Sequence, residues 1–129
     1  MDKLIKREKE NIILNEIYKR KKLFVKDLYI IPEIAKNSIY RHIKDLIKQK
    51  LIEKISVNPI VVTFPLIIRI FLMKIQEEEL MKLNDLEVFI KKSDLKNTEI
   101  LERFVEANIL EITPNEKFIY VSLVETNPG

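Results

Sequence analysis

A chain of 129 residues, with 47% hydrophobic and 33% charged side chains, is long enough for one ordinary domain or two very small ones and has the composition of a folded protein. It contains no cysteine, which excludes disulfides and cysteine-ligated zinc, and its single histidine, His42, cannot build a multi-histidine metal site. Its only glycine is Gly129, so the glycine-rich loops that cradle nucleotide phosphates are excluded as well.

The amino-terminal half of the chain predicts three helices followed by a two-stranded hairpin. Apolar residues recur at helical spacing in the first and third segments, and Pro32 ends the short second one. The hairpin strands flank a tight turn at residues 57–59. The predicted elements are helices over residues 3–20, 25–30 and 37–49 and strands over residues 51–56 and 60–63.

The helix predicted over residues 37–49 has two different faces. Its apolar face consists of Ile39, Ile43, Leu46 and Ile47. Its polar face consists of Asn37, Arg41, Lys44 and Lys48. Cationic side chains can meet DNA phosphates, and Arg or Asn can form paired hydrogen bonds to base edges. The alternative is a solvated helix face, the usual role of a charged stripe. His42, beside Arg41, is expected at the surface.

The run NSIYRHIKDLIKQKLIEKI resembles the recognition helix and first wing strand of archaeal and bacterial winged-helix transcription regulators, in which a pattern S-x-Y-R-H-I/L-K-x-L-x-x-x-x-L-I-E-K recurs. The resemblance covers residues 4–63 and implies a helix that enters the DNA major groove. The chain departs from the family at the wing, VNPIVV, which is short and apolar. By position, the resemblance implies DNA contacts at Asn37, Ser38, Tyr40, Arg41, Lys44 and Lys48.

The remaining residues repeat the pattern of the first half after a shift of 58 positions without a gap. Leu28, Leu46 and Leu51, for example, fall on Leu86, Phe104 and Ile109. The second copy predicts helices over residues 65–78, 83–91 and 96–107 and strands over residues 109–113 and 118–124. The expected fold is therefore mostly α with small β-hairpins (α+β), as two winged-helix units in tandem, residues 1–64 and 65–129. The alternative is one winged helix followed by a single long dimerisation helix over residues 65–92.

Charge separates the two halves. Residues 1–64 hold 15 Lys and Arg against 8 Asp and Glu, a net charge of +7, whereas residues 65–129 hold 8 against 12, a net charge of −4. The repeat places Leu95, Glu99, Glu102 and Glu106 where the first half has its polar stripe. Carboxylates there would be repelled by phosphates, so the second half is expected to bind protein or to dimerise.

These patterns predict a sequence-specific transcription regulator that binds double-stranded DNA. It is expected to form a homodimer through the apolar residues 60–75 and the acidic half. No catalytic residues, metal ligands, cofactor or small-molecule site are expected, and the protein is not expected to be an enzyme. The apolar run 60–73 is too short for a membrane span and no signal peptide is expected at the start, so a cytoplasmic, nucleoid-associated protein is expected. The competing expectation is a tandem winged-helix scaffold subunit of a chromosome, replication, transcription or membrane-remodelling complex.

Overall fold

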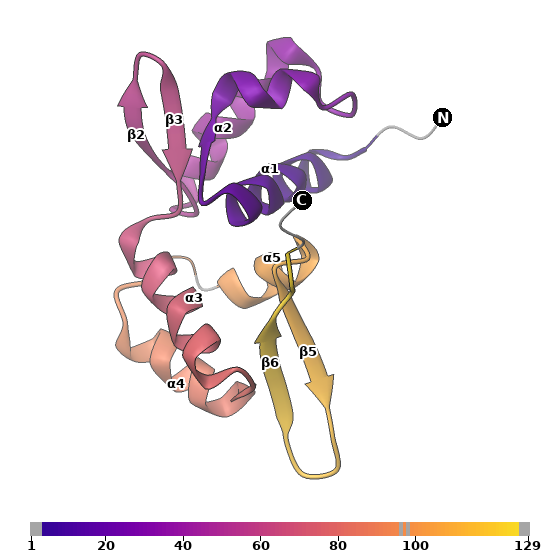
Figure 1. Ribbon diagram of the computed structural model, residues 1–129, viewed down its shortest axis with the longest axis vertical. Helices are drawn as coiled ribbons and strands as arrows, with labels where there is room; N and C mark the ends of the chain where they lie inside the picture. The colour runs from indigo at the N-terminus through magenta and orange to yellow at the C-terminus, as the bar shows by residue number, and fades with distance from the viewer. Residues whose placement is uncertain (1–3, 96, 98, 127–129) are drawn as a thin grey trace. The chain divides into compact units, whose positions relative to one another are not determined.

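The computed structural model describes residues 4–95, 97 and 99–126, and it divides into two compact units between Pro65 and Leu66 (Figure 1). Each unit is a small α+β arrangement with one three-stranded antiparallel sheet. None of the helices in the described part of the chain is long and apolar enough to cross a membrane. The apolar run 60–73, which the sequence predicted to be too short for a membrane span, is divided between a strand and a helix.

The first unit begins with a long helix whose inner side is buried. Its sheet has the order β1-β3-β2, so the short strand after the first helix pairs with the last strand of the unit. The elements are α1 (Lys6–Arg20), β1 (Lys22–Phe24), the 3-10 helices η1 (Val25–Ile30) and η2 (Lys36–Ser38), α2 (Ile39–Lys48), β2 (Glu53–Val57) and β3 (Ile60–Thr63).

Three details of the first unit differ from the sequence prediction. The second helix is a 3-10 helix, and α2 begins at Ile39 because Asn37 and Ser38 belong to the preceding 3-10 turn. Strand β1 was not predicted. Its three residues are too few to show an alternating pattern, and its pairing with Thr63, Val62 and Val61 is a long-range interaction.

The second unit has the same order of helix, short strand, helices and hairpin. Its sheet has the order β4-β6-β5. The elements are α3 (Leu66–Glu78), β4 (Met81–Lys82), α4 (Leu83–Lys92), α5 (Ile100–Glu106), β5 (Leu110–Pro114) and β6 (Ile119–Leu123). The predicted start of the third helix, at residue 96, lies outside the described residues. The alternative of one helix over residues 65–92 is wrong, since helix α3 ends at Glu78 and a strand follows.

Backbone geometry recurs at the repeat distance. Among the described residues, positive φ angles occur at Lys21 (73°) and Glu79 (59°), which follow the first helix of each unit, and at Lys50 (63°) and Asn108 (60°), which follow the last. Each pair is separated by the 58 residues of the predicted shift. Left-handed conformations are rare outside glycine, so their agreement is independent of the abundance of Ile and Leu.

The last helices of the two units also end alike. The amide of Leu51 donates to the carbonyl of Leu46 (3.1 Å) beyond α2, and the amide of Ile109 donates to the carbonyl of Phe104 (2.9 Å) beyond α5. This is the wide hydrogen bond of a Schellman motif, which satisfies carbonyls that a helix terminus leaves without partners. All four side chains are buried, so each motif also joins its helix to the core of its unit.

Each unit buries its own apolar side chains. In the second unit, the rings of Phe71 and Phe104 meet edge to face, with centroids 6.3 Å apart and an interplanar angle of 65°. Helix α3 also carries an exposed apolar stripe, Leu66, Ile70 and Met73. The fully buried side chains include Ile13, Leu14, Ile17, Leu28, Ile39 and Leu46 in the first unit and Ile68, Phe71, Ile75, Leu86, Phe104 and Val121 in the second.

Candidate nucleic-acid interface

Helix α2 presents a fixed face outward because its other face is anchored in the core. Ile39, Ile43 and Leu46 are at most 3% exposed, and Ile47 beside them is half-buried. The predicted apolar face is therefore confirmed. A helix held on one side by three buried residues can rotate little about its axis, so the positions of its outer side chains are determined by its packing.

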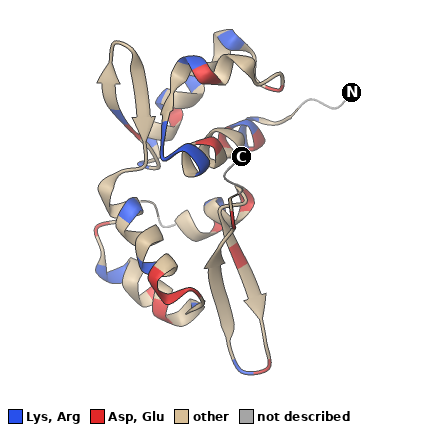
Figure 2. Cartoon of the chain, viewed as in Figure 1, with Lys and Arg blue, Asp and Glu red and all other residues tan. Residues whose placement is uncertain are grey.

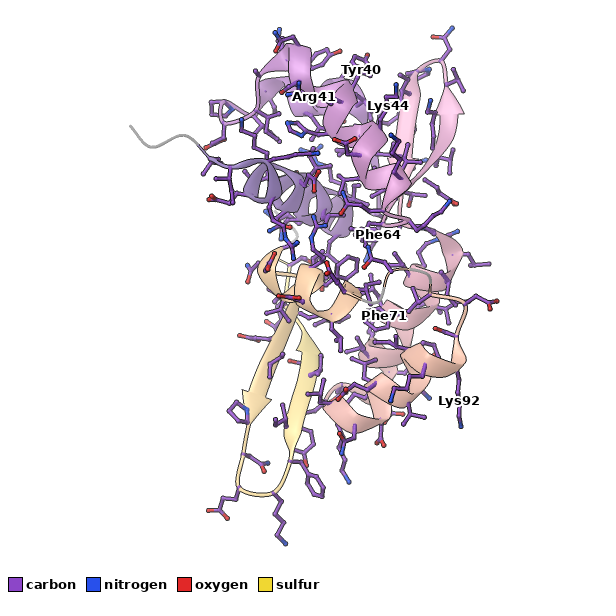
Figure 3. The ribbon with its side chains drawn as sticks, turned by 180° about the vertical axis from the view of Figure 1, so that it is seen from behind. Tyr40, Arg41, Lys44, Phe64, Phe71 and Lys92 are labelled. Atoms are coloured by element: carbon purple, nitrogen blue, oxygen red, sulfur yellow. The ribbon has the colours of Figure 1, made fainter. Side chains whose placement is uncertain are left out.

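The outer face of α2 carries a row of cations. Arg41, Lys44 and Lys48 are all exposed, and no carboxylate of the described residues lies within ion-pair distance of them. They are spaced by three and four residues, so they lie along one side of the helix. Figure 3 labels Arg41, Lys44 and Tyr40 on this helix. We call Tyr40, Arg41, Lys44 and Lys48 the α2 face.

The one acidic residue of α2 is compensated from another helix. The Asp45 carboxylate accepts a hydrogen bond from the Lys6 ammonium group of α1, with 2.6 Å between Nζ and Oδ2. This bond lowers the pKa of Asp45 and raises the pKa of Lys6. Asp45 therefore stays charged, but its charge is paired toward α1, and the α2 face keeps its full positive charge.

His42 is in the core of the first unit, and the prediction of a surface position was wrong. Its side chain is 2% exposed, and its two ring nitrogens have no hydrogen-bond partner among the described residues. His42 lies three residues after Ile39 and one before Ile43, so the helical period directs it inward with them. Burial lowers the pKa of the imidazole, against a smaller opposing effect of the Glu10 carboxylate.

The two predicted DNA contacts that precede α2, Asn37 and Ser38, have different surroundings in the structure. Asn37 is exposed, but Ser38 is 9% exposed and its hydroxyl donates to the carbonyl of Ala35 (2.9 Å). This bond closes the turn that leads into the helix. Ser38 therefore has a structural role at the start of α2, whereas Asn37 is exposed in the 3-10 turn just before the helix.

Sequence reasoning missed a polar cluster next to the α2 face. The hydroxyls of Tyr29 and Tyr40 lie 3.2 Å apart, and this hydrogen bond raises the pKa of Tyr40. The ammonium group of Lys36 lies 5.4 Å from the centre of the Tyr29 ring. Tyr29 and Tyr40 come from different helices, and no local sequence pattern relates residues eleven positions apart, so only the fold brings them together.

The hairpin of the first unit has an apolar outer surface. Val57 is 73% exposed and Ile55 is 52% exposed. The tip contains a cis peptide bond between Asn58 and Pro59, and the Ser56 hydroxyl donates to the Pro59 carbonyl (2.7 Å). The hairpin therefore offers less charge to a phosphate backbone than the α2 face does.

The basic run at the end of α1 is partly neutralised. Arg20 pairs with Glu16 (3.0 Å between Nε and Oε2) and approaches Asp27 (3.8 Å), while Lys19 lies 4.0 Å from Glu16. These exposed pairs contribute little to stability, on the order of 0–1 kcal/mol each. Their effect is to reduce the local positive charge, in contrast to the α2 face.

The equivalent helix of the second unit carries the opposite charge. Glu99, Glu102 and Glu106 are exposed on and just before α5, and Leu95 is half-buried. Figure 2 colours the acidic and basic residues along the chain. Earlier in the unit, further acids lie at Glu77 and Glu78, at the end of α3, and at Glu79 just past it. The described part of the chain contains no cluster of His, Cys, Asp and Glu that could hold a metal ion.

A scan of family models, a search of curated proteins and a search of solved structures each find no match to this chain.

Proposed function

We propose that this protein is a sequence-specific DNA-binding transcription regulator of the winged-helix type, with α2 as the helix that enters the major groove. The observation that carries the proposal is the α2 face, in which Arg41, Lys44 and Lys48 are exposed and have no acidic partner among the described residues. The element order and the sheet order β1-β3-β2 also support it, because the winged-helix expectation requires three helices followed by a paired hairpin.

The dimensions of α2 suit this role. An α-helix with its side chains is about 10–12 Å across, and the major groove of B-DNA is about 12 Å wide. Arg41 has the planar group that forms paired hydrogen bonds to guanine, whereas Lys44 and Lys48 act as point charges for phosphates. Asn37 stands before the helix, where its amide can bond to an adenine edge or a phosphate.

The second unit has a different task in this proposal. Its shared element order and left-handed positions support a second winged-helix copy in tandem with the first, at a distance of 58 residues. Its α5 carries Glu99, Glu102 and Glu106 in place of cations, so a phosphate backbone would repel it. We assign protein contacts to this unit and DNA contacts to the first.

The test is duplex binding by fluorescence anisotropy over a range of salt concentrations. The double variant Arg41→Ala/Lys44→Ala should bind duplex at least about tenfold more weakly, and its plot of log affinity against log salt should be shallower by roughly 0.9 for each phosphate that the variant no longer neutralises. The matched control is Lys91→Ala/Lys92→Ala, which removes two exposed cations from α4 and should leave both quantities unchanged.

Specificity is tested in the same assay with duplexes selected from a random pool. Arg41→Lys keeps the charge but loses the planar, bidentate group, so it should lower the preference for the selected site more than the affinity for unrelated duplex. Absence of duplex binding at low salt by the wild type, or equal binding by the double-alanine variant, would refute the proposal and favour the scaffold function.

A further inference from the structure

Strand β5 of the second unit has a regular outer edge. The hydrogen bonds from Asn115 to Phe118 and from Val124 to Ile109, both 2.9 Å, bracket the β5–β6 ladder. Since antiparallel pairs alternate between bonded and non-bonded, the backbone groups of residues 111 and 113 face β6, and those of residues 110, 112 and 114 face outward. No described strand pairs with this outer edge, because the sheet order is β4-β6-β5.

The corresponding edge in the first unit is interrupted. Strand β2 pairs with β3 through a register shift between Lys54 and Ser56, so Ile55 bulges out of the ladder. Bulges and lysines on an edge prevent a further strand from adding to it. Strand β5 pairs with β6 without any shift over its five residues, and it contains no lysine. Of these two corresponding edges, the β5 edge therefore keeps the regular pairing that allows a sheet to be extended, as far as Pro114 at its end.

An apolar surface accompanies this edge. The register places Ile112 opposite Val121 and Pro114 opposite Ile119, on the same side of the hairpin as the buried Leu110. Ile112 is 44% exposed and Ile119 is 45% exposed. The side of the hairpin that forms the core near its base thus continues as an exposed apolar surface toward its tip.

We propose that two copies of this chain associate through their β5 edges, antiparallel and centred on Ile112, to join their sheets into one. In this register Ile112 of one copy lies opposite Ile112 of the other. The outward amide of each Ile112 donates to the outward carbonyl of the other. The outward Leu110 amide donates to the Pro114 carbonyl of the other copy. Proline has no N–H to donate in return, but Pro114 is the last residue of the ladder, so the pairing is lost only at its end.

The register also avoids a direct like-charge contact. It places Glu111 opposite Thr113 of the other copy, so the two glutamates do not face each other. A two-fold contact of this kind uses one surface twice and closes after two copies. The exposed stripe on α3 lacks such directional groups, and nothing about it specifies an occupant. The β5 edge is therefore a better dimer surface than the apolar residues 60–75.

This inference goes beyond the proposed function and rests on the second unit alone. The contact is short, so we expect a weak dimer whose dissociation constant is in the micromolar range, on the order of that for small interfaces. A dimer would carry two copies of α2, which regulators of paired DNA half-sites require. DNA binding by one α2 face does not require the dimer, and the dimer does not require DNA.

The experiment is sedimentation equilibrium of the full chain, the Ile112→Lys variant and the Ile112→Glu variant. The apparent mass of the wild type should rise with protein concentration from 15.4 kDa toward twice that value. Each variant alone should remain monomeric, because like charges would meet at the two-fold axis. An equimolar mixture of the two variants should regain the dimer, since lysine then faces glutamate. The control Ile55→Lys alters the exposed, bulged strand of the first unit and should not affect association.

A cysteine variant gives a second reading that does not depend on affinity. The chain has no cysteine, so Ile112→Cys introduces a single thiol, which should form an intermolecular disulfide under mild oxidation. Thr113→Cys lies one residue off the axis on the other face and should crosslink far less. A monomeric wild type at millimolar concentration, a mixture that stays monomeric, or equal crosslinking at both positions would overturn the inference. Duplex anisotropy of the same samples reports separately on the proposed function.

Discussion

Helices α2 and α5 end in the same hydrogen-bonded motif and lie at the same place in their units, yet their outer faces have opposite charge. The buried positions are alike in kind, with Leu46 in one unit and Phe104 in the other. The exposed positions are not, since Arg41 and Lys44 correspond to Glu99 and Glu102. Packing and chain reversal are thus shared by the two helices, while their exposed faces differ in charge.

The largest effect expected from this comparison is on core packing. Leu46→Ala should lower the free energy of unfolding of the first unit by about 2–5 kcal/mol, and Phe104→Ala should lower that of the second by about 3–5 kcal/mol, because each leaves a cavity in a fully buried site. Hydrogen exchange followed by NMR would assign each loss to its own unit. Ile30→Ala, at a 78% exposed position, is the control and should change stability by less than about 0.5 kcal/mol.

A smaller effect is expected at His42, whose counterpart 58 residues later is the fully buried Ile100. Because burial lowers the folded-state pKa of His42, the unfolded chain binds more protons once the pH falls below the ordinary value of 6.5. The free energy of unfolding of the first unit should therefore be unaffected by His42 protonation above that pH. It should decrease as the pH falls from 6.5 through the folded-state pKa of His42.

The variant His42→Ile, which copies the second unit, should abolish this acid sensitivity and raise stability at neutral pH, since two buried nitrogens without partners are removed. Urea denaturation of the wild type and the variant at several pH values between about 7 and 5 measures the pH dependence of the free energy of unfolding. Asp45 does not interfere there, because the Lys6 hydrogen bond lowers its pKa below the ordinary 3.8. An unchanged pH dependence in the variant would show that His42 is not the responsible group.

The smallest effect is expected at the left-handed positions that end α2 and α5. Lys50→Gly should raise the free energy of unfolding by up to about 1 kcal/mol, because glycine adopts a φ of 63° without the steric penalty of a lysine Cβ. The gain should appear as a slightly higher melting temperature. Asn108→Gly should change stability less, since asparagine tolerates this conformation better. A lower melting temperature for Lys50→Gly would contradict the assignment of strain to this residue.

The sequence predicted the longer elements correctly because their apolar residues are periodic. It also predicted the cationic row of α2, since those residues follow from the same helical period as Ile39 and Ile43. The short strands β1 and β4 were not predictable from local patterns, because two or three residues show no period and their partners lie far along the chain. The left-handed residues were equally hidden, because none of them is glycine.

The site was predictable only in part. Ser38 was expected to contact DNA from the resemblance alone, but its hydroxyl is used in the turn before α2. His42 was judged by its neighbour Arg41 rather than by its place in the helical period, and the period was decisive. The Tyr29 to Tyr40 pair needed the fold itself, because the two residues come from separate helices.

The positive φ angles at Lys21, Lys50, Glu79 and Asn108 have a consequence for the denatured chain. A protein whose only glycine is its last residue makes these reversals with side chains that resist them, and each non-glycine residue has fewer accessible conformations when unfolded. The penalty is confined to a few positions, while the reduced freedom extends along the whole backbone. Folding therefore starts from a stiffer ensemble and loses less entropy per residue than in a glycine-rich chain of equal length.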